Sequence, residues 1–520
     1  MTTPRVLTSL AVAASLVLAS AACSAPPGAQ SQGASEALNV YLYQKPKRFS
    51  PLDPPTGPDQ QVMQLVYDNL VTVDDGYEYE PRLAEKWEVS RDGAGFTFHL
   101  RKGLKWSDGT PFTSKDVLFS YRLLADAKSG SAMAGKLAGA SFEAPDEHTF
   151  VVRLAKPNVG FLSLIAGPFM FVMPEHVLGK EPLDKVAGSP FFNKPTVGLG
   201  PYTFVQYKTD QYVELAANPH YRKPVAIKKI FLKPVSSDVA TAQLGTGEMD
   251  LAQISPTDLG AVSALKGVTV AAKPSPGFIR IALDLTDKRF ADVRVRRALL
   301  HAVDRAALVD KLLAGKGRVQ NSSFVASWAV PDGLDDYAYD PAKAKALLAE
   351  AGWDANETVT LSWIPGQRDR DAAATVVQSA LGAVGVQVKL KQVQSAELLE
   401  SYEKRTFDLA LFGGGTYAVD PSSSMPIVSC SAFYPSGGNI PRFCDKAVDE
   451  LTAKANATTD QAERTELYRQ AARKENEQAA YLWLYNPDTL WAHSGRLHGF
   501  KASGDFAAGF WNADEWTLAG

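Results

Sequence analysis

Hydrophobic and polar positions along this chain follow two periods. A two-residue period, which is typical of strands, occurs at residues 37–43 and 95–100. A period of three to four residues, which is typical of amphipathic helices, occurs at residues 58–73 and 292–313. Strand-like and helix-like segments alternate over most of the chain, and this order predicts an α/β protein.

The same patterns predict most of the remaining elements. Residues 358–365, 371–385 and 386–393 read as a strand, a helix and a strand, which is a β-α-β unit. A hairpin is expected over residues 200–221. Further strands are expected at 226–235, 277–285, 408–415 and 480–487, and further helices at 238–250, 340–353 and 458–479.

Capping residues mark the ends of two of these helices. Thr113, with Asp116 three residues later, is typical of a helix N-terminus. Pro341 lies in the first turn of another predicted helix, and Gly352 stands where that helix should stop.

Three consecutive glycines, Gly413, Gly414 and Gly415, end the apolar run 409–412. Glycine weakens a strand, so three together require a physical reason. Either another group comes so close to this backbone that side chains must be absent, or the loop after the strand needs positive φ angles.

The length and the net charge of the chain limit how many domains it has and which partners it can bind. A chain of 520 residues is too long for one core and indicates two or three domains. Hydrophobic residues make up 45% and charged residues 21%, which is an ordinary globular balance. The formal net charge of −3 offers no basic surface for nucleic acid, so no nucleic-acid partner is expected.

The N-terminal segment is typical of export. Arg5 precedes an uncharged span, residues 6–22, which is shorter than a membrane helix requires. The segment resembles a bacterial lipoprotein signal, with "SAAC" as its lipobox and Cys23 as the acylated residue. Plain secretion with cleavage near Ala22 is the alternative. Residues 23–36 read as a flexible tether to the outer face of the cell membrane.

Cysteine usage agrees with export. If Cys23 carries lipid, Cys430 and Cys444 remain as an even pair, for which an oxidising compartment favours a disulfide. Two free buried thiols are the alternative. A metal site made by two cysteines alone would be incomplete, so no metal is expected.

Catalytic motifs are absent from the sequence. It contains no nucleophile elbow, no zinc-protease motif, no phosphate-binding P-loop and no dinucleotide fingerprint. We therefore expect neither an enzyme nor a bound cofactor.

Several segments, in order along the chain, resemble the extracellular solute-binding proteins of family 5. The family includes the dipeptide-, oligopeptide- and nickel-binding components of ABC importers. The signature region corresponds to "EPRLAEKWEVSRDGAGFTFHLRKGLKWSDGTPFTSKDV". The likeness continues at "GLGPYTFVQY", "NPHYRKP", "GEMDLAQ", "FADVRVRRALLHAVDRAALVD" and "YDPAKAKALLAEAGW".

The resemblance implies a two-lobed periplasmic-binding-protein fold of type II, with hinge-linked lobes and an extra small domain inserted in the first lobe. The expected first lobe comprises residues 37–50, 190–276 and 488–520. The additional domain would be 51–189, and the second lobe 277–487.

The resemblance also implies a binding site between the lobes. The glycines at 413, 414 and 415, with Thr416 and Tyr417, would let the backbone of an extended ligand come close. Peptide-binding members have an Asp, which pairs with the ligand amine, where this chain has Tyr417. Either Asp420 takes over the amine, or the ligand has no free amine there.

Other site residues follow from the same resemblance. Arg368, with Arg370 as the fallback, matches the arginine that grips a ligand carboxylate, although a surface arginine is an equal alternative. Trp328 and Trp363 could line the cleft or be core aromatics, and Tyr43 is a candidate for the facing wall. Residues 428–460 resemble a segment of dipeptide-binding members in which two cysteines close a loop, which predicts a Cys430–Cys444 disulfide.

The function implied is that of a monomeric lipoprotein that captures a small solute, preferably a short peptide, and delivers it to ABC permease subunits with cytoplasmic ATPases. An oligosaccharide or another non-peptide solute is the alternative within this class. An extracytoplasmic enzyme or a sensory lipoprotein on the same fold are the alternatives outside it.

Overall fold

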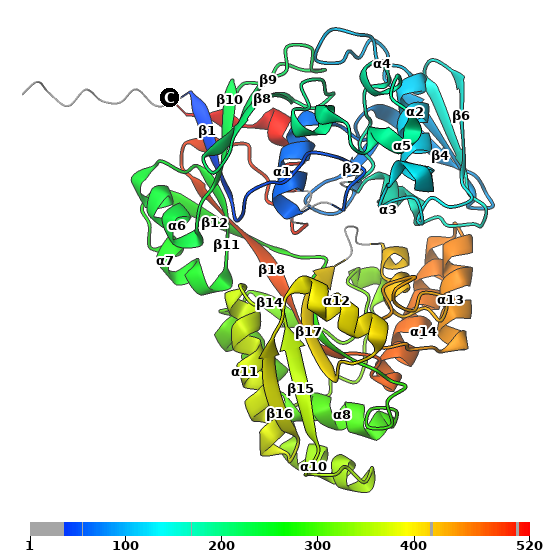
Figure 1. Ribbon diagram of the computed structural model, residues 1–520, viewed down its shortest axis with the longest axis vertical. Coiled ribbons are helices and arrows are strands. Elements are labelled where there is room, and N and C mark those ends of the chain that lie inside the picture. The colour runs from blue at the N-terminus through cyan, green and yellow to red at the C-terminus, as the bar shows by residue number, and fades with distance from the viewer. Residues whose placement is uncertain (1–35, 55, 168, 416–419, 506–508, 520) are drawn as a thin grey trace, which may run out of the picture. The chain divides into compact units, whose positions relative to one another are not determined.

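The computed structural model describes residues 36–54, 56–167, 169–415, 420–505 and 509–519, and Figure 1 shows how their elements are arranged. The expectations for Cys23, Thr416, Tyr417 and the N-terminal signal segment lie outside the described residues. Within the described ranges, no helix is long and apolar enough to cross a membrane.

The largest sheet has twelve strands, and the long strand β18 (Leu482–Ser494) runs through it. The first part of β18 pairs with β13 (Gly277–Leu283) and β14 (Gly317–Val319). Its last part pairs with β11 (Leu251–Ile254) and β12 (Val268–Pro274). One continuous strand therefore belongs to both halves of the sheet.

The chain also passes between these halves at Ser275 and Pro276, which connect β12 to β13. Asn486 of β18 is fully buried, and its side-chain Nδ2 donates to the carbonyl oxygen of Ser275 at 2.9 Å and to that of Gly277. Hydrogen bonds thus fasten the two passages to each other.

One half of the sheet continues from β11 through four further strands. In order they are β1 (Ala37–Leu42), β10 (Lys229–Pro234), β9 (Tyr212–Ala217) and β8 (Tyr202–Lys208). Strand β1 is parallel to both of its neighbours, whereas β8 and β9 form the predicted hairpin. Helix α1 (Gly57–Val66) packs on one face, and α6 (Ser237–Thr246) and α7 (Leu259–Ser263) pack on the other.

The other half continues from β13 through β17 (Leu409–Gly415), β15 (Thr358–Trp363) and β16 (Gln387–Gln392). Both faces are buried by helices. One face carries α8 (Val293–Ala302), α10 (Pro341–Glu350) and α11 (Arg368–Ala383). The opposite face carries α12 (Ser395–Lys404), α13 (Lys446–Ala457) and α14 (Gln461–Gln478).

The β-α-β prediction is confirmed, because β15 and β16 are parallel and α11 connects them. Two apolar faces also explain why β13 is an almost unbroken apolar run.

A separate antiparallel sheet has four strands and its own apolar core. Its strands, in spatial order, are β4 (Ala84–Val89), β5 (Gly95–Leu100), β7 (Thr149–Arg153) and β6 (Ser141–Asp146). Alternate side chains of β5 are buried, as its period predicted. Nearby elements are α2 (Ser114–Ala125), α3 (Phe161–Ile165), α4 (Glu175–Leu178), α5 (Leu183–Val186) and the strand pair β2 (Val71–Val73) and β3 (Tyr79–Pro81).

Both predicted helix starts are confirmed. The Thr113 hydroxyl accepts the N–H of Lys115 at 3.3 Å, and the Asp116 carboxylate accepts the N–H of Thr113 at 2.9 Å. Pro341 opens α10, and Gly352 follows the end of that helix with a positive φ of 70°.

The prediction of a single helix over residues 292–313 is wrong. Helix α8 ends at Ala302, and Val303 is extended. Asp304 then caps a new start, because its carboxylate accepts the N–H of Ala307 at 2.9 Å. The second piece is α9 (Arg305–Ala307) followed by one π-helical turn, residues 308–312. An aspartate that binds the backbone in this way offers the chain an alternative to a continuous helix.

The strand predicted at 480–487 is also longer than expected, since β18 extends to Ser494. Two short strands, β19 (Leu497–His498) and β20 (Thr517–Leu518), follow it and pair with each other.

Two charged residues are buried where α14 packs on the sheet: Arg280 of β13 and Glu475 of α14. The guanidinium carbon of Arg280 is 4.3–5.6 Å from four aromatic ring centres, which belong to Phe278, Phe412, Tyr481 and Trp483. The carboxylate of Glu475 accepts the N–H and the hydroxyl of Ser323 at 2.9 and 2.6 Å. Burial raises the pKa of Glu475 to about 7, although Ser323 and the charge of Arg280 act in the opposite direction.

Glu475→Gln should remove a pH-dependent contribution to the free energy of unfolding. The carboxyl pKa rises from 4.5 to about 7 on folding, so the folded state holds the proton more tightly. The contribution of Glu475 to stability is therefore full below about pH 4.5 and is lost as pH rises through 7. Glutamine imitates the protonated carboxyl, so the variant should lack this slope, which is at most about 1 kcal/mol per pH unit.

Urea unfolding at several pH values between 5 and 8 measures this slope. Glu477→Gln, an exposed position on the same helix, is the matched control and should keep the wild-type slope. Identical slopes in Glu475→Gln and wild type would contradict the assignment.

A disulfide closes a loop after β17. The sulfurs of Cys430 and Cys444 are 2.11 Å apart, and their Cα atoms are 4.5 Å apart. Within the loop, the buried Asn439 side chain donates to the carbonyl oxygens of Ser429 and Phe443 at 2.8 and 2.7 Å. The covalent bond and the amide together fix the shape of this loop.

Cys444→Ser should lower the thermal midpoint of the oxidised protein by several degrees. A closed loop of this length stabilises the folded state by about 3 kcal/mol in the chain-entropy model. Calorimetry with and without reductant checks this. The reductant should lower the midpoint of the wild type and leave that of the variant unchanged. A variant as stable as the oxidised wild type would refute the stabilising role.

Candidate functional site

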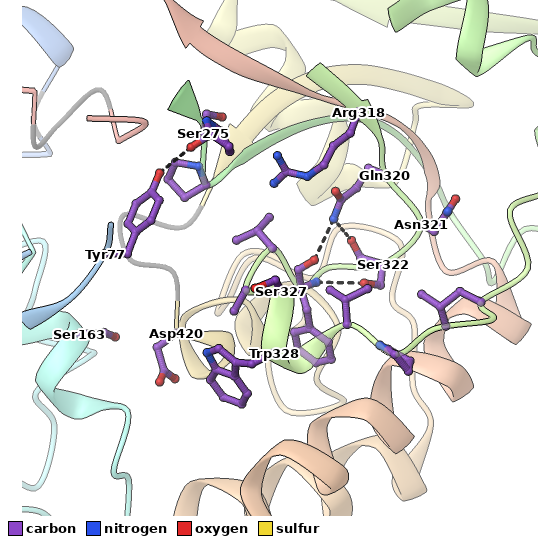
Figure 2. A pocket seen from close by; sticks show the side chains of 18 of the residues that line it. Tyr77, Ser163, Ser275, Arg318, Gln320, Asn321, Ser322, Ser327, Trp328 and Asp420 are labelled. Atoms are coloured by element: carbon purple, nitrogen blue, oxygen red, sulfur yellow. Dashed lines mark hydrogen bonds between the residues drawn. The ribbon is translucent and has the colours of Figure 1, made fainter. Parts of the chain in front are cut away.

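A cavity of about 1160 Å³ lies beside the β12–β13 connection, strand β14 and the turn between β2 and β3. Its lining comes from three regions of the chain: residues 73–79 around the β2–β3 turn, residues 274–276, and residues 318–334. Ser163, Asp420, Gln461 and Arg464 complete the lining. Figure 2 shows that side chains from all of these regions face the same space.

Asp420 and Arg464 form a paired charge at the wall of the cavity. Both guanidinium Nη atoms of Arg464 donate to the two Asp420 oxygens, each at 2.8 Å, and both side chains are more than nine-tenths buried. Trp328 and Tyr468 place their ring centres 5.3 and 5.2 Å from the same guanidinium. The arrangement is bidentate and stacked, which is the strongest form of such a pair.

Local structure explains why these two residues meet. Asp420 precedes Pro421 and opens a short 3₁₀ turn, whose Ser422 N–H it accepts at 3.0 Å. Arg464 lies in the first turn of α14, where a positive charge is unfavourable for the helix dipole. Burial lowers the pKa of Arg464, but pairing with Asp420 outweighs burial, and the pKa is raised overall.

Arg318 lies on the other side of the cavity. It is the central residue of β14, and Figure 2 shows its guanidinium directed into the cavity from the side opposite Trp328 and Asp420. Burial lowers its pKa, while Asp488 and Tyr77 act in the opposite direction. A cation that has lost part of its water gains strongly from any anion that reaches it.

Tyr77 and Gln320 are held in place around Arg318 by the backbone. Tyr77 has a positive φ of 67°, and its hydroxyl donates to the carbonyl oxygen of Pro274 at 2.7 Å. Gln320 donates from Nε2 to the carbonyl oxygens of Ser322 and, at 3.0 Å, Phe324. The cavity wall is therefore rigid where these side chains meet it.

The three glycines are the last residues of β17, in agreement with the strand predicted over residues 408–415, and are not a loop that follows it. Gly413 lies opposite Ile279 in β13, Gly414 opposite Phe278, and Gly415 opposite Gly277. Neither Gly413 nor Gly414 has a positive φ, so the strained-loop interpretation is wrong for them.

The group that comes close to this backbone is the side chain of Arg370. A Cβ atom built at Gly413 would lie 2.9 Å from the guanidinium carbon of Arg370 and 2.7 Å from Cδ1 of Ile279. At Gly414 the nearest atom would be Nη1 of Arg280, at 3.9 Å. Neither glycine lines the cavity.

Of the remaining candidate residues, some line the cavity and others lie outside it. Trp328 and Asp420 line the cavity, whereas Trp363 is a core residue whose Nε1 donates to Asp371 at 2.7 Å. Arg368 lies outside it and pairs with Asp238 and Asp258, each at 3.1 Å. Tyr43 is exposed and does not line it either.

Sequence reasoning missed Tyr77, Arg318 and Arg464. Arg464 lies in a helix that reads as a solvated surface element, and Arg318 lies in a short polar stretch without a clear period. The one local signal was the "DDGY" turn, in which Asp74 accepts the N–H groups of Gly76 and Glu78 at 2.8 and 2.9 Å.

In the part of the chain that the structure describes, no three His, Cys, Asp or Glu side chains gather as potential metal ligands. The cavity presents the carboxylates of Glu78, Asp332 and Asp420, two arginines, neutral polar groups and aromatic rings, a mixture that is typical of binding sites.

Comparison with known proteins gives a consistent result. The family model described as "Bacterial extracellular solute-binding proteins, family 5 Middle" matches residues 78–434. A Brucella melitensis protein, provisionally named an ABC transporter peptide-binding protein, is 31% identical over 466 residues, covering 87% of this chain and 88% of its own. The dipeptide-binding protein of Escherichia coli is 29% identical over 485 residues, 87% of each chain.

Among solved structures, the oligopeptide-binding protein AppA from Bacillus subtilis, in complex with a nonapeptide, matches with a TM-score of 0.80 at 25% identity. The match covers 93% of this chain and 99% of that one. The expected two-lobed type II fold of periplasmic binding proteins is thereby confirmed. The chain belongs to the bacterial extracellular solute-binding proteins of family 5, which are transport components rather than enzymes.

Proposed function

We propose that this protein is the solute receptor of an ABC importer and that its solutes are short peptides. The observation that carries the proposal is the cavity of about 1160 Å³, lined by the β12–β13 connection, by residues between Arg318 and Leu334 and by the β2–β3 turn. Its volume lies just above the range of typical small-molecule sites, which span about 300–1,000 Å³. The names of the Brucella, Escherichia and Bacillus relatives support peptides as the solute class.

The mechanism is capture by closure. The first lobe would comprise residues 37–50, 190–276 and 488–520, and the second lobe residues 277–487. The additional domain, residues 51–189, would move with the first lobe. Rotation would occur at the passages through Ser275 and β18, which Asn486 links.

Two ion pairs favour the closed arrangement. Arg368, in the second lobe, pairs with Asp238 and Asp258, in the first lobe. The Arg368 side chain, common to both pairs, is 54% exposed, so each pair contributes little by itself. They are therefore suited to shifting the equilibrium between the open and closed forms slightly, and not to holding the protein in the closed form.

To deliver its solute, the receptor must be anchored to the membrane and must meet a permease. Acylation of Cys23 would anchor the receptor outside the cell membrane, and the tether would let the closed form reach permease subunits with cytoplasmic ATPases. The lipoprotein signal and the relatives named as ABC transporter components support this arrangement.

A solute without a free amine, such as an oligosaccharide, is the second candidate. It is favoured by the pairing of Asp420, whose two oxygens are already occupied by Arg464. A ligand amine could use Asp420 only by displacing that guanidinium, which would leave a buried charge without its partner.

Native mass spectrometry of gently purified protein lacking its signal segment tests the solute class. We expect co-purified species that fragment as short peptides. Protein stripped by unfolding and refolding should then bind a randomised library of di- to tetrapeptides. Binding of an oligosaccharide panel with no uptake from the peptide library would refute the peptide assignment and establish the second candidate.

Trp328→Ala should weaken binding of a peptide recovered from that library roughly tenfold, because an aromatic wall contributes about 1–1.5 kcal/mol to contacts with a ligand. Trp328→Phe should recover most of the affinity. Trp511→Ala, which removes a partly buried tryptophan outside the cavity, is the control. Isothermal titration that shows equal affinities for Trp328→Ala and wild type would place the ligand elsewhere.

A further inference from the structure

The two arginines that line the cavity differ in their partners. Arg464 is neutralised by Asp420 through two hydrogen bonds of 2.8 Å. Arg318 also lines the cavity and is partly buried, yet no carboxylate among the described residues comes within ion-pair distance of it. The charge of one cavity arginine, Arg464, is therefore neutralised by a carboxylate, and the charge of the other, Arg318, is not.

The surroundings of Arg318 leave its charge available. Asp488 influences it electrostatically, but Asp488 also interacts with Lys316, and burial raises the pKa of its own carboxyl. Tyr77, the other neighbour, already donates its hydroxyl hydrogen to Pro274. Two further carboxylates line the cavity, those of Glu78 and Asp332, but both residues are exposed, so solvent screens them.

We propose that Arg318 binds the terminal carboxylate of the peptide, so that the ligand enters with its acidic end at β14 and its remaining residues toward Trp328. A guanidinium presents paired donors that match a carboxylate geometrically. Figure 2 shows the space between Arg318 and Trp328 that the peptide would occupy. This inference rests on the proposed peptide function.

The arginines expected from the sequence to bind a carboxylate are engaged elsewhere. Arg368 pairs with Asp238 and Asp258, and Arg370 packs on Gly413 and donates to Gln367. Neither lines the cavity. The carboxylate subsite is thus assigned to a strand of the hinge region instead of to the start of α11.

The test compares peptides that differ only at the carboxyl end. A randomised tripeptide library is prepared as free acids and as C-terminal amides, and the best binders are measured by isothermal titration. Wild-type protein should prefer the acids roughly ten- to a hundredfold, as expected for a charge-assisted hydrogen bond. Arg318→Gln should remove this preference, and Arg318→Lys should keep part of it.

Arg473→Gln removes an exposed arginine of α14 outside the cavity and should leave the acid preference unchanged. Thermal unfolding verifies that each variant is folded, and if Arg318→Gln does not fold, the acid–amide ratio of wild type and of Arg318→Lys decides. Equal binding of acids and amides by wild type, or an unchanged preference in Arg318→Gln, would overturn the inference while leaving peptide binding intact. Failure of both libraries would refute the peptide function itself, and the inference with it.

Discussion

The hydrogen bonds of Asn486 are the constraint on which the arrangement of the two halves depends. A fully buried amide must satisfy its donors within the protein, and here both go to the segment that connects β12 to β13. The two places where the chain passes between the halves are therefore joined. Ser275 and Arg318, which line the cavity, lie next to this junction.

Charge placement around the cavity follows from the cost of burying ions. Arg464 is tolerated in a buried helix start because Asp420 compensates it, and Trp328 and Tyr468 cover both. Arg318 retains access to the cavity and no comparable partner in the described part of the chain. If Arg318 binds the terminal carboxylate as proposed, the permanent pair shapes the wall while the other cation interacts with the ligand.

Local patterns predicted the elements well because their causes are local. The alternation in β5, the capping box at Thr113 and the β-α-β order around α11 depend on neighbouring residues only. The break at Val303 was missed because Asp304 is compatible with either one helix or two. Resemblance to a family indicated the fold correctly, since it draws on segments along the whole chain.

The site was harder to predict because its residues meet only after folding. Trp328 and Asp420 were named from the sequence and line the cavity, but Arg318 and Tyr77 come from distant segments that carry no shared pattern. A close approach to the backbone, which the glycines of β17 suggested, is found at Gly413 and not at Gly414. Which group approaches could not be read from the chain, because Arg370 lies on a different element.

The close packing at Gly413 has a consequence for natural variation. Arg370 and Ile279 occupy the volume that a side chain at position 413 would need. Substitutions at these three positions are consequently not independent, and the effect of one depends on which residues stand at the other two. Related sequences are therefore expected either to change all three residues together or to keep all three.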